Sequence, residues 1–354
     1  MNACNGRLTW RKRLSSKPFR LLFRQERYLQ LRAYYIEEMN NEISFIVNGI
    51  DHAFRREFGC TCDRCKVREE RANTSVSLVV RDESKDEIIW HALVDVGLGV
   101  VDSLCDKFPP SQARLDLLLL THWHPDHTLN LNSLCETLKR SKEQQKIKMW
   151  CRSGSAEHLR KTHPFEWKHR LDVTESGEYH PPGIKLPPIE SDRFNFSKFS
   201  LVITPVTVSH SSADKEKPSS ASFVIQWKDT KIVLLWDIDN GNDWIENQIS
   251  NEQKETVKFL SGADYLFIDC NTWSVEEVNG KNTGHASFQT VKRYARVLNP
   301  KQAVLVHLSG HEDRRGNPGY GWVDGRWQAE ANKSWEDEEL PGNVIVNKDL
   351  ILEF

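Results

Sequence analysis

Three histidines and one aspartate lie within six residues in the middle of the sequence, at His122, His124, Asp126 and His127. They follow the leucine run 117–120, which is typical of a buried strand. Imidazole and carboxylate together suit zinc, manganese or iron. Because His122 and His124 are two residues apart, both can face one metal, and Asp126 and His127 on the next bend can reach a second. The spacing therefore predicts two ions side by side.

Further candidate ligands stand directly after strand-like segments later in the chain: His210, Asp237 and His307. A lone histidine at a strand end is more often structural, so these residues are candidates only through their shared position. Asp239 is an alternative to Asp237, two residues on and facing the same side. We prefer Asp237 because it directly follows an apolar strand.

Three cysteines form a second cluster of metal-binding type upstream, C-x-C-x-x-C at Cys60, Cys62 and Cys65. A secreted disulfide framework would spread its cysteines more evenly, so the cluster indicates metal binding in a reducing compartment. Three thiolates can share one zinc, but a closed structural site needs a fourth ligand.

Composition places the chain among soluble globular proteins. It has 354 residues, 38% hydrophobic and 28% charged, with a net charge of −2. A net charge this close to zero gives no long-range electrostatic attraction that would favour binding to nucleic acid or a membrane. No apolar run reaches the length of a membrane span. The first 25 residues are basic, with no acidic residue. This predicts a solvated extension or an organelle transit peptide. We expect a cytoplasmic protein, with a mitochondrial location as the alternative.

The order of elements predicts a basic extension over residues 1–40 and one domain over 41–354. β-rich and helical stretches alternate twice, a pattern that favours two sheets packed face to face with helices outside. Residues 161–199 contain five prolines and few apolar runs. They predict a long surface insertion, either a lid or a plain loop.

The H-x-H-x-D-H sequence after a hydrophobic strand resembles the central motif of metallo-β-lactamase-fold hydrolases. The resemblance implies an α/β fold, the four-layer αββα sandwich. It also implies how the candidates share their metals: His122, His124 and His210 hold the first ion, Asp126, His127 and His307 hold the second, and Asp237 bridges the two. Asp95, which ends a strand upstream, is expected to orient a ligand histidine or simply to end its strand.

The upstream cysteines resemble those of the PhnP-like phosphodiesterase branch of this superfamily. In that branch the cysteines and a histidine just after the last metal ligand hold a structural zinc. The resemblance therefore implies one zinc bound by Cys60, Cys62, Cys65 and His311. Here His311 lies four residues after His307, whereas three are expected, and Ser309-Gly310 could absorb the extra residue.

The resemblance implies His285 and Asp126 as the catalytic residues, with His285 as general acid. His285 follows Gly284 where a helix is expected to open. A helix N-terminus lowers the pKa of a histidine. His285 therefore has two possible roles: a general acid, or a neutral ring that forms a hydrogen bond with a phosphate oxygen.

The implied function is hydrolysis of a small phosphodiester, cyclic or linear, or a nucleotide, by water activated on two zinc or manganese ions. Other hydrolases of the fold are alternatives: a lactonase, a thioesterase or a tRNA-processing nuclease. A PqqB-like oxygenase and a non-catalytic RNA-binding scaffold are further alternatives, against which the intact motif argues. No membrane partner is expected, while nucleic acid and the oligomeric state stay open.

Overall fold

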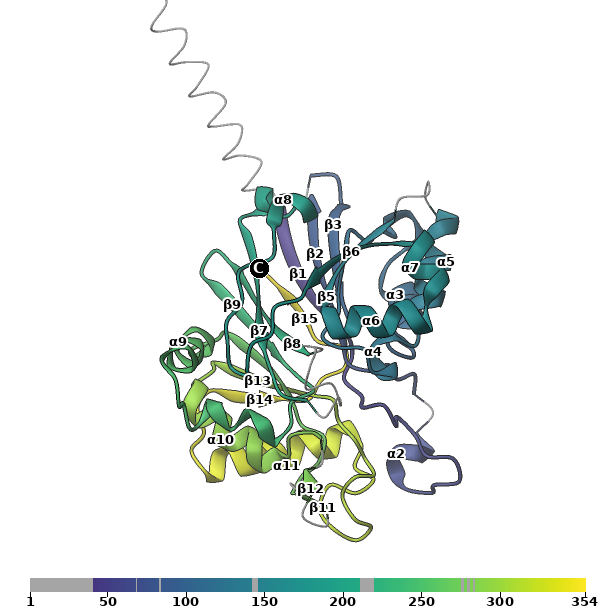
Figure 1. Ribbon diagram of the computed structural model, residues 1–354. Coiled ribbons are helices and arrows are strands. Elements are labelled where there is room, and N and C mark those ends of the chain that lie inside the picture. The colour runs from purple at the N-terminus through teal and green to yellow at the C-terminus, as the bar shows by residue number, and fades with distance from the viewer. Residues whose placement is uncertain are drawn as a thin grey trace, which may run out of the picture. The chain divides into compact units, whose positions relative to one another are not determined.

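Two β-sheets lie face to face in the computed structural model of the protein (Figure 1). The structure describes residues 41–354 except 68, 83, 142–145, 211–219, 275–276, 279–280 and 283. The extension predicted over residues 1–40 therefore lies outside the described residues. No helix that the structure describes is long and apolar enough to cross a bilayer.

The first sheet contains seven strands in the order β15-β1-β2-β3-β4-β5-β6. Their bounds are β1 (Asn41–Gly49), β2 (Ser75–Asp82), β3 (Glu87–Val94), β4 (Leu117–Leu119), β5 (Ile147–Arg152), β6 (Leu171–Ser176) and β15 (Ile351–Glu353). β2 and β3 are antiparallel, whereas β3 to β6 are parallel. β4 is buried, as its leucine run predicts, and its carboxyl end leads into the histidine motif.

The second sheet contains six strands in the order β14-β13-β10-β9-β8-β7. Their bounds are β7 (Leu201–Thr207), β8 (Ala221–Trp227), β9 (Thr230–Leu235), β10 (Tyr265–Asp269), β13 (Gln302–Val306) and β14 (Asn343–Ile345). β9, β10 and β13 are parallel neighbours. Because parallel strands end at the same edge, the residues after these three strands meet there.

Aromatic contacts between the sheets show that the two inner faces form one core. The ring centroids of Phe45 on β1 and Phe267 on β10 are 5.0 Å apart. Those of Trp150 on β5 and Phe223 on β8 are 5.4 Å apart. The inward-facing side chains of both sheets belong to one buried cluster, as expected where two sheets interdigitate.

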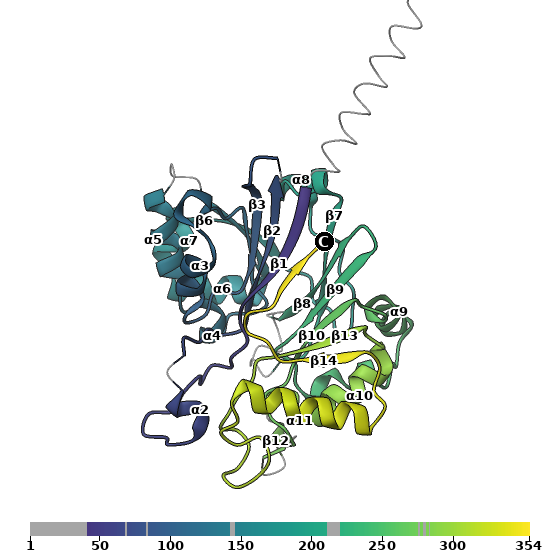
Figure 2. The same cartoon turned by 180° about the vertical axis from the view of Figure 1, so that it is seen from behind.

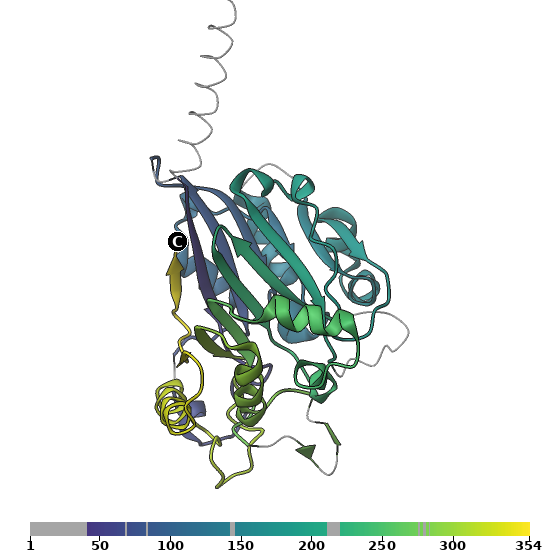
Figure 3. The same cartoon turned by 90° about the vertical axis from the view of Figure 1, so that its left-hand side faces the viewer.

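Helices cover both outer faces (Figures 1 and 2). On the first sheet these are α3 (Val100–Lys107), α5 (Leu131–Ser141), α6 (Ser153–Thr162) and α7 (Pro164–His169). On the second sheet they are α9 (Asn251–Leu260), α10 (Phe288–Leu298) and α11 (Asp324–Asp337). Figure 3 shows α9 lying across the second sheet. The predicted α/β fold, an αββα sandwich, is confirmed.

Short elements complete the chain. They are α2 (Asp63–Lys66), α4 (Pro125–Thr128), α8 (Ser191–Phe194), the 3₁₀ turns η1 (Pro110–Gln112), η2 (Ser197–Phe199) and η3 (Asn240–Ile245), and the two-stranded β11 (Glu277–Val278) and β12 (Lys281–Asn282).

Residues 161–199 differ from the surface insertion predicted for them. They include α7, α8 and β6, which is the edge strand of the first sheet. Phe194 and Phe199 are buried in the core between the sheets. The indole of Trp90 donates a hydrogen bond to the Phe194 carbonyl at 3.0 Å. Isolated aromatic residues between prolines contribute to the core here without forming an apolar run, so the pattern did not reveal them.

Candidate metal centre

The loop after β4 and the loops after three strands of the second sheet bring seven candidate ligands together. The possible ligand atoms of His122, His124 and His210 lie within 4.8 Å of one another. The same holds for a second group, which consists of Asp126, His127, Asp237 and His307. These two groups have the same members as the two ligand sets that the motif implied.

Asp237 lies between the two groups. Its Oδ1 is 3.9 Å from Nε2 of His122 and 3.8 Å from Nε2 of His210 in the first group. The same oxygen is 3.3 Å from Nε2 of His307, and Oδ2 is 3.1 Å from Nε2 of His127, in the second group. A single carboxylate can therefore contact ions in both groups. Asp239 lies outside them and accepts a hydrogen bond from the backbone N–H of Gly241 at 2.8 Å, as the N-cap of η3.

Backbone strain occurs where the strands deliver these side chains. Asp95, Asp237 and His307 have φ angles of 61°, 54° and 60°, in the left-handed region that non-glycine residues rarely adopt. Each such residue costs about 1–3 kcal/mol and persists only where the surroundings fix it. Asp95 and His307 directly follow a buried strand, and Asp237 comes two residues after the end of one, so the turn redirects each side chain toward the site.

Hydrogen bonds from the far side of the imidazole rings set which nitrogen faces the site. His127 donates from Nδ1 to Oδ2 of Asp95 at 2.8 Å, and the Thr121 backbone N–H fixes the other oxygen of Asp95 at 2.8 Å. His210 donates from Nδ1 to the Gly284 carbonyl at 3.0 Å. Both rings therefore direct Nε2 toward the site, as metal-binding histidines do.

Unpaired buried atoms in this cluster fit bound cations. Nε2 of His122, Nε2 of His127 and both carboxylate oxygens of Asp237 are buried without a hydrogen bond among the described residues. Unpaired buried polar atoms are costly, and cations would satisfy all four.

Burial holds the pKa of His122 well below its usual range. Burial also opposes protonation of His127, but Asp237, Asp126 and Asp95 raise its pKa well above the usual range.

His285 lies beside the second group and differs in one respect from its prediction. α10 begins at Phe288 after the N-cap Ser287, so His285 precedes the helix and is not in its first turn. Its Nδ1 donates to Oδ2 of Asp269 at 3.0 Å. Burial opposes the charged form, but the Asp269 carboxylate outweighs it and raises the pKa of His285 to about 9. The expectation of a lowered pKa was therefore wrong, because the carboxylate comes from another strand.

A family model described as the beta-lactamase superfamily domain matches residues 92–308 of this sequence. The chain belongs to this superfamily. The match begins within β3 and ends one residue after His307, so it contains every member of both ligand groups. Among proteins of curated function, none matches the sequence significantly.

Solved structures of the metallo-β-lactamase fold resemble the chain over most of its length. YhfI from Bacillus subtilis is 16% identical with a TM-score of 0.59, covering 89% of this chain and 100% of its own. A diphosphatase of the PhnP family is 17% identical with a TM-score of 0.57, covering 88% and 97%. Zn²⁺-bound PqqB from Methylobacterium extorquens is 14% identical with a TM-score of 0.59, covering 87% and 99%. These likenesses confirm the fold.

This β-lactamase superfamily member has a second ligand cluster around α2, outside the matched residues. The possible ligand atoms of Cys60, Cys62, Cys65 and His311 lie within 4.8 Å of one another. Nε2 of His311 is 3.4 Å from Sγ of Cys62 and 3.1 Å from Sγ of Cys65. The Ser309 hydroxyl accepts the His311 backbone N–H at 3.2 Å, which forms a turn that accommodates the extra residue.

A buried charge network ties the cysteine cluster to the rest of the fold. Arg64 of α2 is fully buried and contacts Asp51 at 2.5 Å and Asp324 of α11 at 3.1 Å. Arg71 contacts the same Asp51 oxygen at 2.9 Å. Arg64 also donates to the Leu308 carbonyl at 3.2 Å. The cysteine loop is thus fixed to the backbone next to the candidate ligand His307.

Two residues beside the candidate ligands were missed at the sequence level. Asp269, the partner of His285, ends the buried strand β10, so the strand-end rule applied to Asp237 could have found it. His52 is buried, with its ring centroid 4.8 Å from that of His307 and 5.1 Å from that of His285. No motif contains His52, and only the pairing of distant segments brings it to the site.

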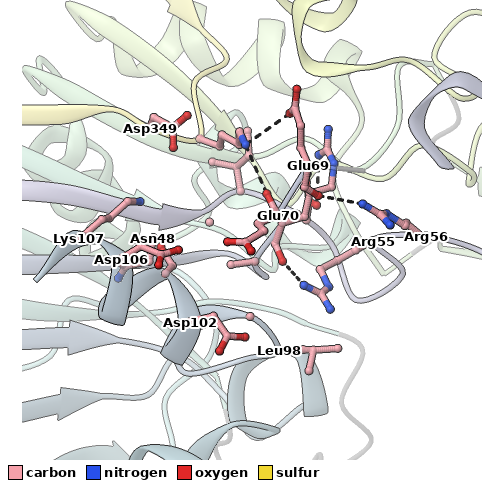
Figure 4. A pocket seen from close by; sticks show the side chains of 18 of the residues that line it. Asn48, Arg55, Arg56, Glu69, Glu70, Leu98, Asp102, Asp106, Lys107 and Asp349 are labelled. Carbon is pink, nitrogen blue, oxygen red and sulfur yellow. Dashed lines mark hydrogen bonds and ion pairs between the residues drawn. The ribbon is translucent and has the colours of Figure 1, made fainter. Parts of the chain in front are cut away.

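A cavity of about 660 Å³ lies next to the loop that carries His52 (Figure 4). Asp51 and Ala53 line it, together with residues of α3, but no histidine does. Basic and acidic side chains alternate around it, and Nζ of Lys348 is 3.4 Å from a carboxylate oxygen of Glu69. Its mixed charge favours no single class of ligand.

Proposed function

We propose that this protein is a dinuclear metal phosphodiesterase that cleaves a small phosphodiester, cyclic or linear, or a nucleotide. The observation that carries the proposal is the position of Asp237 within contact distance of both ligand groups. In the proposal it bridges two zinc or manganese ions. The ligand sets are His122, His124 and His210 for one ion and Asp126, His127 and His307 for the other. The structural likeness to a diphosphatase of the PhnP family supports this chemistry.

Charge in the site favours an anionic substrate. Two bound divalent cations would polarise a phosphoryl oxygen and lower the pKa of a bound water. Asp126 and Asp237 are the only carboxylates in the two described ligand groups. Two carboxylates offset half of the charge of two divalent cations, so the loaded site keeps a net positive charge. A phosphodiester anion is attracted to such a site more strongly than a neutral ester.

His285 is the proposed proton donor. The Asp269 carboxylate raises the pKa of His285, which favours the protonated ring, and the Nδ1 bond to Asp269 holds the ring in place. The leaving alkoxide of an ordinary phosphodiester needs a proton, whereas p-nitrophenolate leaves without one. The contribution of His285 should therefore depend on the leaving group.

Asp269→Asn tests this positioning role. The amide keeps an oxygen for the His285 N–H but removes the charge that raises its pKa. We expect kcat on a 2′,3′-cyclic nucleotide to fall about 10²-fold, with little change in KM or in kcat on bis(p-nitrophenyl) phosphate. Steady-state measurement of kcat and KM on both substrates tests this prediction. Equal losses on the two substrates would show that Asp269 only supports the fold.

The structural zinc completes the proposal. Cys60, Cys62, Cys65 and His311 form a closed four-ligand set of the type that binds zinc without an open position. Elemental analysis of the purified protein, with assays on bis(p-nitrophenyl) phosphate and cyclic phosphates, tests the whole assignment. About three metals per chain, at least one of them zinc, with ester cleavage is the expected result. One metal without cleavage would contradict the dinuclear hydrolase.

A PqqB-like oxygenase is the second candidate, because the Zn²⁺-bound PqqB structure resembles this chain as strongly as any hydrolase compared above. The two candidates differ in their demand for oxygen. Phosphodiester cleavage that continues at the same rate under anaerobic conditions would favour the hydrolase.

A further inference from the structure

His52 is held beside the metal centre by backbone pairing between two distant segments. The His52 N–H donates to the Leu308 carbonyl at 3.2 Å, and the Leu308 N–H donates to the Ile50 carbonyl at 2.9 Å. The Asn73 side chain donates to the His52 carbonyl at 2.9 Å. The loop after β1 is therefore fixed in register with the residue that follows His307.

The ring of His52 has a defined tautomer. The backbone N–H of Phe54 donates to Nδ1 of His52 at 3.3 Å. An acceptor at Nδ1 means that the neutral ring carries its hydrogen on Nε2. None of the residues that the structure describes accepts a hydrogen bond from this Nε2. Next to His285 and His307, the ring thus has a donor without a partner among the described residues.

His52 is distinct from the two ligand groups. Its possible ligand atom lies within 4.8 Å of those of His285 and His307, but it belongs to neither of the two groups that hold the seven candidate ligands. His52 is grouped with the proposed proton donor His285 and with one proposed ligand, His307. This position suits contact with the substrate rather than with a metal.

We propose that His52 is a substrate-binding residue that donates a hydrogen bond from Nε2 to a non-bridging phosphoryl oxygen. This inference rests on the proposed function and deepens it. The ring centroids of His52 and His285 are 5.1 Å apart, so in this proposal both imidazoles contact one phosphoryl group. The site is thereby selective for tetrahedral phosphoryl anions over the flat carbonyl group of lactones and thioesters.

Two conservative variants separate substrate binding from support of the loop. His52→Gln places an amide N–H near the position of Nε2 but leaves the Phe54 N–H without Nδ1. His52→Asn places an oxygen near Nδ1 for Phe54 but cannot reach the substrate. We expect His52→Asn to raise KM for bis(p-nitrophenyl) phosphate and Kd for inorganic phosphate about tenfold or more, and His52→Gln to restore most of the loss. His169→Asn, at an exposed histidine on α7, is the matched control.

The outcomes distinguish this inference from the proposed function. If His52→Asn kept the wild-type KM and Kd while His52→Gln did not, the ring would support the loop and not bind the substrate. A loss of bound metal in His52→Asn would also overturn the substrate-binding role. If the wild-type protein cleaves no phosphodiester, the proposed function fails. In that case the calorimetric Kd for inorganic phosphate on the metal-loaded protein still decides the role of His52. Unchanged Kd values in both variants would refute it.

Discussion

Asp126→Ala is expected to reduce phosphodiester hydrolysis by about 10³-fold or more while the chain stays folded. Oδ2 of Asp126 is 3.1 Å from Nε2 of His307 and 3.4 Å from Nε2 of His127. It belongs to the second ligand group and is a buried polar residue, not a member of the hydrophobic core clusters. Its loss should remove one metal and with it half of the centre. Kinetics on bis(p-nitrophenyl) phosphate, elemental analysis and a thermal melt together check the prediction.

Asp239→Asn is the matched control for this variant. Asp239 lies near the site but outside both ligand groups, and an asparagine oxygen can still accept the Gly241 N–H. We expect it to keep its metals and its turnover. A fully active Asp126→Ala protein would refute the two-metal mechanism, whereas inactivity of both variants would point to a general loss of the loop structure.

The second large effect is expected in the cysteine cluster. Cys62→Ser should lose the structural zinc and lower Tm by about 5 °C or more, because a structural zinc contributes folding free energy directly. Cys62 also packs closely against Gly321, whose positive φ of 67° and missing Cβ permit the contact. The two metals of the dinuclear centre should remain. Elemental analysis and differential scanning calorimetry measure the two effects separately.

Cys105→Ser provides the comparison, since Cys105 is an exposed thiol on α3 away from both centres. It should match the wild-type protein in Tm and zinc content. If Cys62→Ser behaved in the same way as Cys105→Ser, the structural-zinc assignment would be wrong.

The contiguous motif carried most of the information that the sequence held about the site. Its four residues follow one strand, so a single local pattern placed them together. His210, Asp237 and His307 came from the resemblance, because strand ends alone do not select them. His311 joins the cysteines despite its extra residue, because the turn at Ser309 absorbs it.

The features that were missed depend on contacts between distant segments. His52 reaches the site only because residues 50–52 pair with Leu308. The hydrophobic periodicity of a local segment does not predict pairing with a distant one. The pKa of His285 was misjudged because the helix begins three residues later and the dominant charge, Asp269, comes from β10. In residues 161–199, isolated phenylalanines fill the core without forming a periodic pattern.

The left-handed backbone at Asp95, Asp237 and His307 has a consequence for the life of the protein in the cell. A metal that binds only the folded state stabilises it in proportion to the logarithm of its concentration over Kd. Bound metals would add binding free energy that offsets this strain and the burial of the Asp237 oxygens, which accept no hydrogen bond among the described residues. We therefore expect the metal-free chain to open more often and to be cleaved sooner by proteases. Metal supply would then set the abundance of the protein as well as its activity.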